Sequence, residues 1–191
     1  MAGGQEGVLM ELGNYLTQEW KPALGCTEPA SIALAAANAA SVSKGEVRSV
    51  RLVCDPRIYK NCYAVGIPHS GGESGILWAA AIGAHLPDPA CGLEGFRQAT
   101  PEILAAAAAL IGTGLVSVEV DSSHRELHVD CRVARAEGSG RAVIHGEHTG
   151  LVQLESNGEP IPLPEAASQD HDEGAAALRK QLAYMSFPDM I

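Results

Sequence analysis

The stretch "KPALGCTEP", residues 21–29, places a thiol and a carboxylate two positions apart where a helix is expected to begin. The positive end of a helix dipole lowers the pKa of a nearby thiol, which suits Cys26 to act as a nucleophile, a base or an iron ligand. The other interpretation is a small buried hydrophobic side chain. Glu28 is either a partner of this thiol or a simple helix-capping carboxylate. Because no second cysteine or histidine stands at ligand spacing, the segment does not form a metal site by itself.

Two further segments carry polar groups that could face a small substrate. "HSGGESG", residues 69–75, has three glycines ahead of a helical pattern. Such backbone amides suit a carboxylate or a phosphate, although an ordinary turn explains the same residues. The segment lacks the features of a nucleotide-binding loop. In "IYKN", Lys60 and Asn61 are either part of a plain turn or a cation and an amide directed at a substrate.

Four histidines lie between residues 124 and 148. His145 and His148 of "HGEHTG" would project to opposite faces of a continuing strand, which argues against a shared metal ion. His124 is expected in a turn, and His128 on the solvent face of a strand. We interpret all four as surface groups.

Hydrophobic periodicity predicts the elements that must position these groups. Thr27 is expected to be the N-cap of an alanine-rich helix that follows the thiol. The helices are predicted at about 8–20, 30–43, 76–86, 93–99, from Thr100 onward and at 175–185. The strands are predicted at 46–54, 58–68, 116–120, 127–133 and 141–156, with turns at 138–140 and at Asn157-Gly158.

This pattern predicts an α+β fold, with alanine-rich helices packed on a mainly antiparallel sheet. Aromatic residues make up only 4% of the chain, so close packing of alanines is expected to replace large rings in the core. Residues 1–161 are expected to form one α+β domain. Residues 162–191 are expected to form a linker and the start of a further helix.

Composition excludes several classes of partner. A chain of 191 residues that is 46% hydrophobic can bury a core of its own. Its net charge of -10 disfavours nucleic acid and anionic lipid, and no segment has the pattern of a membrane span or a signal peptide, so a cytoplasmic location is expected. The odd number of cysteines and the lack of a CxxC pair argue against a disulfide framework or a local zinc site. Cys54, Cys62, Cys91 and Cys131 are interpreted as structural.

Five motifs carry a family resemblance. They are "PALGCTEPASIALAAA", "IYKN", "VGIP", "TPEI" and "EHTG", within about residues 9–160. In this order and at these separations, they resemble the N-terminal half of the iron-sulfur L-cysteine desulfidase family. That family is related to the alpha chain of iron-sulfur L-serine dehydratases. The most specific part of the resemblance is GCTEP ahead of an alanine-rich helix.

The resemblance implies a lyase that uses a 4Fe-4S cluster to eliminate sulfide from L-cysteine, or water from L-serine, leaving pyruvate and ammonia. An iron with an open position would act as a Lewis acid on the leaving group while a base removes the α proton. Cys26 is then implied to be a catalytic or cluster-adjacent thiol, with Glu28 as a second catalytic residue. The substrate-side candidates implied in the same way are Thr27, Lys60, Asn61, Pro68, Ser70, Gly71, His148 and Thr149.

In the family, the remaining cluster cysteines lie in a C-terminal helical domain, and this chain stops where that domain would start. We therefore expect the N-terminal portion or a subunit of such a lyase, inactive and without a stable cluster until the C-terminal half or a partner subunit completes it. A small amino acid is the expected ligand, and homo-oligomerisation stays open. The rival hypothesis is a non-catalytic domain that binds or senses a small amino acid on the same scaffold.

Overall fold

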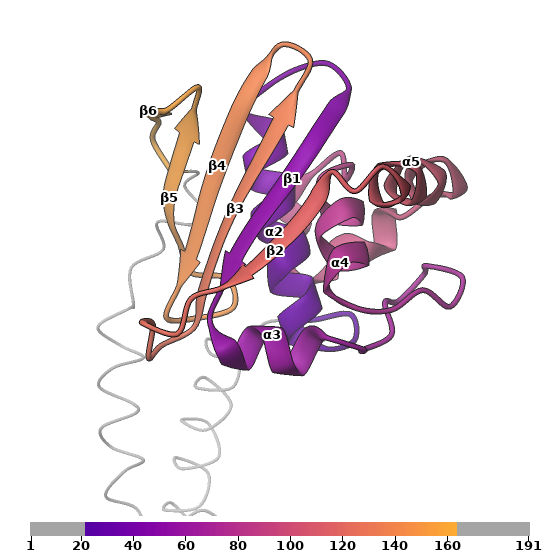
Figure 1. The fold of residues 1–191 in the computed structure, drawn as a ribbon, viewed down its shortest axis with the longest axis horizontal. Helices are drawn as coiled ribbons and strands as arrows, with labels where there is room; N and C mark the ends of the chain where they lie inside the picture. The colour runs from indigo at the N-terminus through magenta and orange to yellow at the C-terminus, as the bar shows by residue number, and fades with distance from the viewer. Residues whose placement is uncertain (1–21, 164–191) are drawn as a thin grey trace, which may run out of the picture. The chain divides into compact units, whose positions relative to one another are not determined.

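A computed structural model describes residues 22–163, in which helices pack on one face of a six-stranded sheet (Figure 1). The helices are α2 (Thr27–Ser41), α3 (Pro56–Cys62), α4 (Ile76–Gly83), the 3-10 helix η1 (Pro89–Gln98) and α5 (Pro101–Gly112). The strands are β1 (Val47–Cys54), β2 (Val116–Val120), β3 (His128–Arg135), β4 (Gly138–His145), β5 (Leu151–Ser156) and β6 (Glu159–Pro160). This arrangement confirms the predicted α+β fold.

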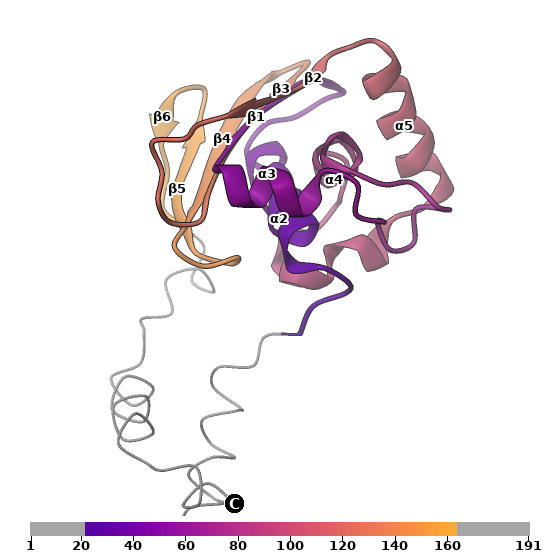
Figure 2. The same ribbon diagram turned by 60° about the horizontal axis from the view of Figure 1, so that its bottom comes forward.

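The strands lie in the order β2-β1-β3-β4-β5-β6. β1 and β2 run parallel, and the other neighbouring pairs among the described strands are antiparallel. Val50, Leu52 and Cys54 of β1 are buried, whereas Arg51 is exposed and pairs with Glu119 of β2 across 3.0 Å. The sheet therefore has one apolar face and one polar face. The helices lie on one side of the sheet only (Figure 2).

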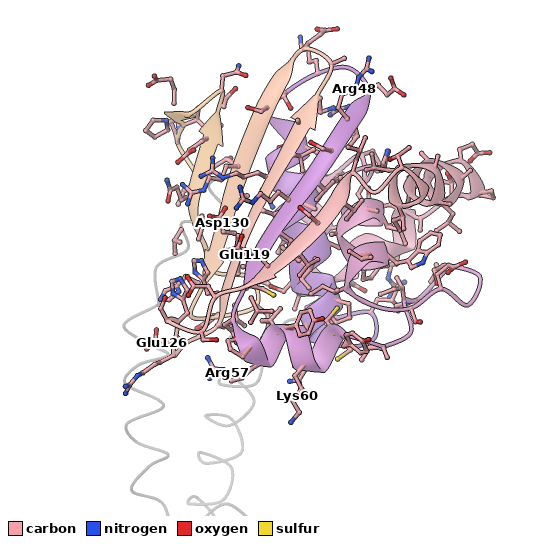
Figure 3. The ribbon with its side chains drawn as sticks, viewed as in Figure 1. Arg48, Arg57, Lys60, Glu119, Glu126 and Asp130 are labelled. Carbon is pink, nitrogen blue, oxygen red and sulfur yellow. The ribbon has the colours of Figure 1, made fainter. Side chains whose placement is uncertain are left out.

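An ion network lies on the polar face of the sheet. Arg141 of β4 donates to Asp130 of β3 at 2.8 and 2.9 Å and to Glu155 of β5 at 2.8 Å. Figure 3 shows Asp130 and Glu119 over the face of the sheet that the helices leave open. The network joins three neighbouring strands through their side chains.

Small residues allow α2 to lie directly on its neighbours. A Cβ atom at Gly140 of β4 would overlap the carbonyl oxygen of Ala39, and one at Gly83 of α4 would lie 2.5 Å from the Cα atom of Ala33. At both positions the backbone of one element therefore lies directly against the backbone of another. The packing agrees with the alanine-rich core that the sequence predicts.

The predicted strand at 58–68 is wrong, because its first half forms helix α3. Asp55 caps this helix by accepting from the backbone N–H groups of Arg57 at 2.8 Å and Ile58 at 3.3 Å. Pro56 follows at the first helical position, where its fixed φ favours a helix. This start signal outweighs the partly alternating pattern of apolar residues that follows it.

The predicted N-cap of α2 is displaced by one residue. Cys26 is the N-cap, with an extended backbone and no capping hydrogen bond from its side chain, and Thr27 is the first helical residue. By contrast, Thr100 caps α5 as predicted and accepts from the N–H of Ile103 at 3.4 Å.

The predicted turn at 138–140 is also displaced, because these residues belong to β4 and pair with β3. The chain reverses at the two preceding residues, Ala136 and Glu137. In addition, β1 lies between β2 and β3, so these two strands do not form a hairpin. The turn at Asn157-Gly158 is confirmed, with φ values of 53° and 87° that suit a tight hairpin.

The predicted helices at 8–20 and 175–185 and most of the predicted linker lie outside the described residues. Within residues 22–163, no helix has the length and apolar character needed to cross a bilayer.

Candidate functional site

The start of α2 brings together a thiol, a carboxylate and an amide. The Sγ atom of Cys26 donates to Oε2 of Glu28 at 2.8 Å, and the hydroxyl of Thr27 donates to the same oxygen at 3.3 Å. From α3, Nδ2 of Asn61 donates to Oε1 of Glu28 at 3.0 Å. Both carboxylate oxygens of Glu28 are therefore engaged, and the three side chains of Cys26, Glu28 and Asn61 form one connected group.

Gly25 fixes the approach of the chain to this group. Its φ of 81° lies in the left-handed region, and a Cβ atom there would lie 2.7 Å from Cγ of Pro68. Glycine is required on both grounds, because other residues adopt this φ at a cost and would collide with the proline. The contact sets the loop that contains Pro68 beside the thiol segment.

Hydrogen bonding fixes which member of the Cys26–Glu28 pair carries the charge. Burial and the adjacent carboxylate of Glu28 raise the pKa of Cys26 above its ordinary value. Partial burial also opposes ionisation of Glu28, but hydrogen bonds from Cys26, from its own backbone N–H and from Asn61 outweigh it and lower the pKa of Glu28. The resting pair is a neutral thiol beside a carboxylate, so the prediction of a lowered thiol pKa is wrong.

His148 and Thr149, in the turn between β4 and β5, were also predicted to face a substrate. His148 lies near enough for its charge to contribute to the lowered pKa of Glu28. The carbonyl of Thr149 accepts from the N–H of Leu151 at 2.9 Å in the turn between β4 and β5. The structure thus brings His148 toward the Cys26–Glu28–Asn61 group, although it belongs to a distant part of the sequence.

The remaining candidates differ in their accessibility. Lys60 of α3 is exposed and extends away from the domain in Figure 3. Ser70 is buried, and its hydroxyl donates to the carbonyl of Ile67 at 2.7 Å, which assigns it to holding the loop closed. Gly71 is exposed at a φ of 75° with open space around its Cα atom, so its backbone is accessible to a ligand.

The cysteines fall into separate environments. Cys26 is half-buried, whereas Cys54, Cys62 and Cys131 are buried in the core and Cys91 is exposed on η1. Burial raises the pKa of Cys54 and Cys62 to about 12, as expected for thiols that fill space. Among the described residues, Cys26 is therefore the one thiol at this group that could reach a ligand.

A second cluster was missed in the sequence. His124, His128 and His145 each offer a ring nitrogen, and these three atoms lie within 4.8 Å of one another. Direct pairing of His128 with His145 across β3 and β4 creates the cluster. A hairpin reversal placed at residues 136 and 137 would have predicted this pairing, because His128 and His145 stand equally far from it on either side. The structure agrees with a turn position for His124 and a polar-face position for His128, and it adds the convergence of the three rings, which the sequence analysis did not predict.

A cavity of about 700 Å³ lies elsewhere, lined by the end of α2, the start of β1, α4 and α5. Its polar lining includes Arg48, His85 and Arg135. None of the residues predicted to form the site lines this cavity. The group at the start of α2 is therefore separate from this cavity.

The chain is similar over most of its length to UPF0597 proteins. It is 36% identical over 181 residues to a UPF0597 protein of Geobacter sulfurreducens, covering 93% of this chain and 41% of that protein. It is 37% identical over 151 residues to one of Klebsiella pneumoniae, covering 79% of this chain and 35% of that protein. It is 38% identical over 150 residues to one of Desulfatibacillum aliphaticivorans, covering 78% and 34%.

UPF0597 proteins are thus homologues of this chain, and the chain spans 41% or less of the length of these three relatives. Their names state no activity, substrate or cofactor. No family model matches the chain, and no solved structure matches it.

Proposed function

We propose that this chain supplies the amino-acid-binding side of an iron-sulfur lyase, which eliminates sulfide from L-cysteine or water from L-serine. The observation that carries the proposal is the connected group of Cys26, Glu28 and Asn61 at the start of α2. Its thiol, carboxylate and amide come from the two motifs, GCTEP and IYKN, that carry the family resemblance.

The groups of this chain match the parts of an amino-acid zwitterion. The carboxylate of Glu28 attracts the substrate ammonium, and its lowered pKa keeps it ionised at neutral pH. The exposed backbone around Gly71 suits the substrate carboxylate. In the elimination, a base takes the α proton, its electron pair forms the Cα–Cβ double bond, and the C–S or C–O bond breaks. Hydrolysis of the resulting enamine then gives pyruvate and ammonia.

Cys26 and Glu28 are the candidates for moving the proton. They already share one across 2.8 Å, so loss of the thiol proton to Glu28 would leave a thiolate, which is a much stronger base than a carboxylate. This transfer is unfavourable at rest because of the raised pKa of Cys26. A positive charge beside Glu28 alone would favour the carboxylate, whereas one beside the thiol would favour the thiolate, so the transfer needs the bound ammonium to lie nearer to Cys26.

The described residues do not by themselves fit a 4Fe-4S cluster. Such a cluster is typically held by about four cysteine thiolates, or fewer where one iron stays open. Around the Cys26 group, the described residues offer one accessible thiol. The proposal therefore assigns no reaction step on a cluster to this chain. It places the missing ligands in the length that the UPF0597 relatives have beyond the matched region.

Ligand binding by the purified chain is the first test. We expect L-cysteine and L-serine, but not their D-enantiomers, to raise the temperature of thermal unfolding. Glu28→Gln and Asn61→Ala should abolish this response, whereas Glu46→Gln, an exposed carboxylate at the start of the sheet, should keep it. Unfolding temperatures unaffected by either L-amino acid would contradict the proposed binding role.

Turnover is the second test. The chain would be mixed anaerobically with the part of a UPF0597 relative that it does not cover, supplied with iron and sulfide, and assayed for pyruvate. We expect pyruvate from the wild-type chain and none from Cys26→Ser. Stabilisation by ligand without turnover, unchanged in Cys26→Ser, would replace the lyase with the alternative, a non-catalytic amino-acid-binding domain.

The charge distribution of the Cys26–Glu28 pair has a separate test. Because Glu28 contributes to the raised pKa of Cys26, Glu28→Gln should lower that pKa and speed alkylation of Cys26 by iodoacetamide near neutral pH. Peptide mass spectrometry follows the rate at Cys26, with the exposed Cys91 of the same molecule as an internal control. An unchanged or slower rate at Cys26 would contradict this assignment.

A further inference from the structure

We propose that His124, His128 and His145 form a binding site for a divalent metal ion of the zinc class. The site is independent of the proposed lyase function, and its residues lie outside the group formed by Cys26, Glu28 and Asn61. Its basis is the convergence of three imidazole rings from two paired strands and the turn before them.

Backbone pairing holds two of the rings in place. His128 is the first residue of β3 and His145 the last of β4, and they stand directly opposite each other. Asp55 fixes His128 from both sides, accepting from its N–H at 2.9 Å and donating to its carbonyl at 3.1 Å. The N–H of His145 donates to the carbonyl of Gly150 at 2.9 Å. Two ligands on a rigid strand pair are a preorganised half of a metal site.

The third ring comes from the polar turn between β2 and β3. Asp121 opens this turn and accepts from the N–H of Ser123 at 2.8 Å. The ring of His124 stacks on that of His128 with 3.6 Å between centroids and 10° between planes. The ring of His145 meets both of them edge-on, at 6.3 and 5.8 Å.

One ring nitrogen in this cluster lacks a partner. Nδ1 of His128 is buried and makes no hydrogen bond within the described part of the chain. Buried polar atoms are nearly always paired, so an unpartnered nitrogen beside two other imidazoles points to a missing ligand. Neutral imidazole nitrogen is a preferred ligand of zinc, copper and nickel.

The geometry needs only a local change to receive an ion. Three nitrogens at about 2.0–2.1 Å from a tetrahedral zinc ion lie about 3.3 Å from one another. Here they lie within 4.8 Å, so the rings have to close by side-chain rotation. His124 is the ring that would move, since its stacked position on His128 does not let both rings point to one ion and its turn is less constrained than the strands.

Two carboxylates complete the surroundings of the rings. Nε2 of His145 lies 3.3 Å from Oε2 of Glu126, and Nε2 of His124 lies 3.5 Å from Oδ2 of Asp121. Figure 3 shows Glu126 in the same turn region, beside the start of β3. Carboxylates in this position orient ligand imidazoles and offset the charge of the ion, and either one could also supply a fourth ligand.

The test uses the full chain, free of any histidine tag and stripped of metal with a chelator. Zinc ions are titrated in competition with a chromophoric chelator, and cobalt ions report the ligand geometry through their visible spectrum. We expect one ion per chain and a spectrum typical of tetrahedral cobalt with nitrogen and oxygen ligands. Each of His124→Gln, His128→Gln and His145→Gln should weaken zinc binding by about 100-fold or more, since loss of a second-shell partner alone costs about 10- to 100-fold.

Two control variants and one carboxylate variant separate this site from other causes. His85→Gln removes a histidine in the turn after α4, whose ring contacts the carbonyl of Ala81, and should leave zinc affinity unchanged. Cys26→Ser should also leave it unchanged. Glu126→Gln should weaken binding by about 10-fold through loss of ring orientation. If a strand variant unfolds by circular dichroism, His124→Gln and Glu126→Gln in the turn carry the decision.

The proposal is overturned if the wild-type chain fails to compete for zinc. It is likewise overturned if Cys26→Ser abolishes binding while the histidine variants retain it, because the ion would then sit on the thiol. Equal weakening in His85→Gln and His124→Gln would also overturn it, since binding would then be non-specific.

Discussion

Replacing Asp55 by alanine should destabilise the domain more than the loss of an ordinary helix cap. Its side chain is fully buried and accepts three backbone hydrogen bonds. Two come from Arg57 and Ile58 at the start of α3, and the third comes from His128 at the start of β3. One carboxylate therefore ties the helix that carries Asn61 to the strand that begins the histidine cluster.

The expected magnitude follows from these three bonds. Loss of a helix cap costs about 1 kcal/mol. Leaving the N–H of His128 unpaired away from water adds about 1–3 kcal/mol. The ion pair with the exposed side chain of Arg57 adds little because solvent screens it. We therefore expect Asp55→Ala to lower the free energy of unfolding by about 3 kcal/mol.

Urea unfolding followed by far-ultraviolet circular dichroism measures this difference. Asp88→Ala is the matched control, because Asp88 caps η1 through the N–H of Ala90 at 2.8 Å but is exposed. The control should cost at most about 1 kcal/mol. Equal losses in the two variants would refute the reasoning, since burial of the Asp55 bonds would then have no consequence.

Acid gives a second readout for Asp55. Burial works against its ionisation, but the N–H groups of His128, Arg57 and Ile58 outweigh this and lower its pKa. A carboxyl whose pKa is lower in the folded state stabilises above its unfolded pKa of about 3.9 and loses that contribution as pH falls through the folded value. The gap between wild type and Asp55→Ala should be constant near neutral pH and shrink below about pH 4. A gap that widens in acid would contradict the assignment.

Two further substitutions probe the packing and the polar face of the sheet. Gly140→Ala should lower the free energy of unfolding by about 3 kcal/mol or more, because the new Cβ atom would overlap the carbonyl oxygen of Ala39 in α2 and neither backbone can withdraw freely. Gly112→Ala is the control, because open space surrounds that position, and it should change the stability by at most about 1 kcal/mol. Thermal unfolding distinguishes the two variants. Arg141→Met should lower the free energy of unfolding by about 2 kcal/mol, because it leaves the half-buried carboxylates of Asp130 and Glu155 without their cation. Arg51→Met breaks an exposed pair and should cost less than about 1 kcal/mol. Similar losses of the two variants in urea unfolding would show that burial of the network is unimportant.

The elements predicted correctly are those with a regular apolar pattern on one face or a clear start signal. β1 and β3 were found because their apolar residues alternate, and α5 because Thr100 and Pro101 mark its start. α3 was missed although Asp55 and Pro56 carry the same kind of start signal. The partly alternating apolar residues that follow Pro56 resemble a strand, but the cap formed by Asp55 stabilises a short helix there.

The candidate site was predictable in its members more than in its geometry. Cys26 and Glu28 are close in sequence, and their motif identified them. The bond from Asn61 to Glu28 joins positions 33 residues apart and depends on the packing of α3 against α2, which local pattern does not encode. The pKa of Cys26 was misjudged because the helix dipole was considered without the carboxylate that lies 2.8 Å from the thiol.

The histidine cluster depends on strand register. A reversal at residues 136 and 137 puts His128 opposite His145, whereas a reversal centred two or three positions later separates them. Glycines at 138 and 140 favoured the later turn, but Gly140 serves close contact with α2 instead. Glycine at position 140 therefore does mark a special backbone position, but that position is a close contact with a helix and not a turn.

The position of β1 in the sheet has a consequence for the order of folding. Val50 pairs with Val116 on one side and with Val133 on the other, so this central strand is synthesised well before either neighbour. The meander of β3, β4 and β5 closes through short loops, and we expect it to form first, because contacts between distant residues form slowly. Pulse-labelled hydrogen exchange would test this, since amides of β4 should gain protection before those of β1. Until the later strands emerge from the ribosome, β1 has two unpaired edges, a state that favours pairing with other chains.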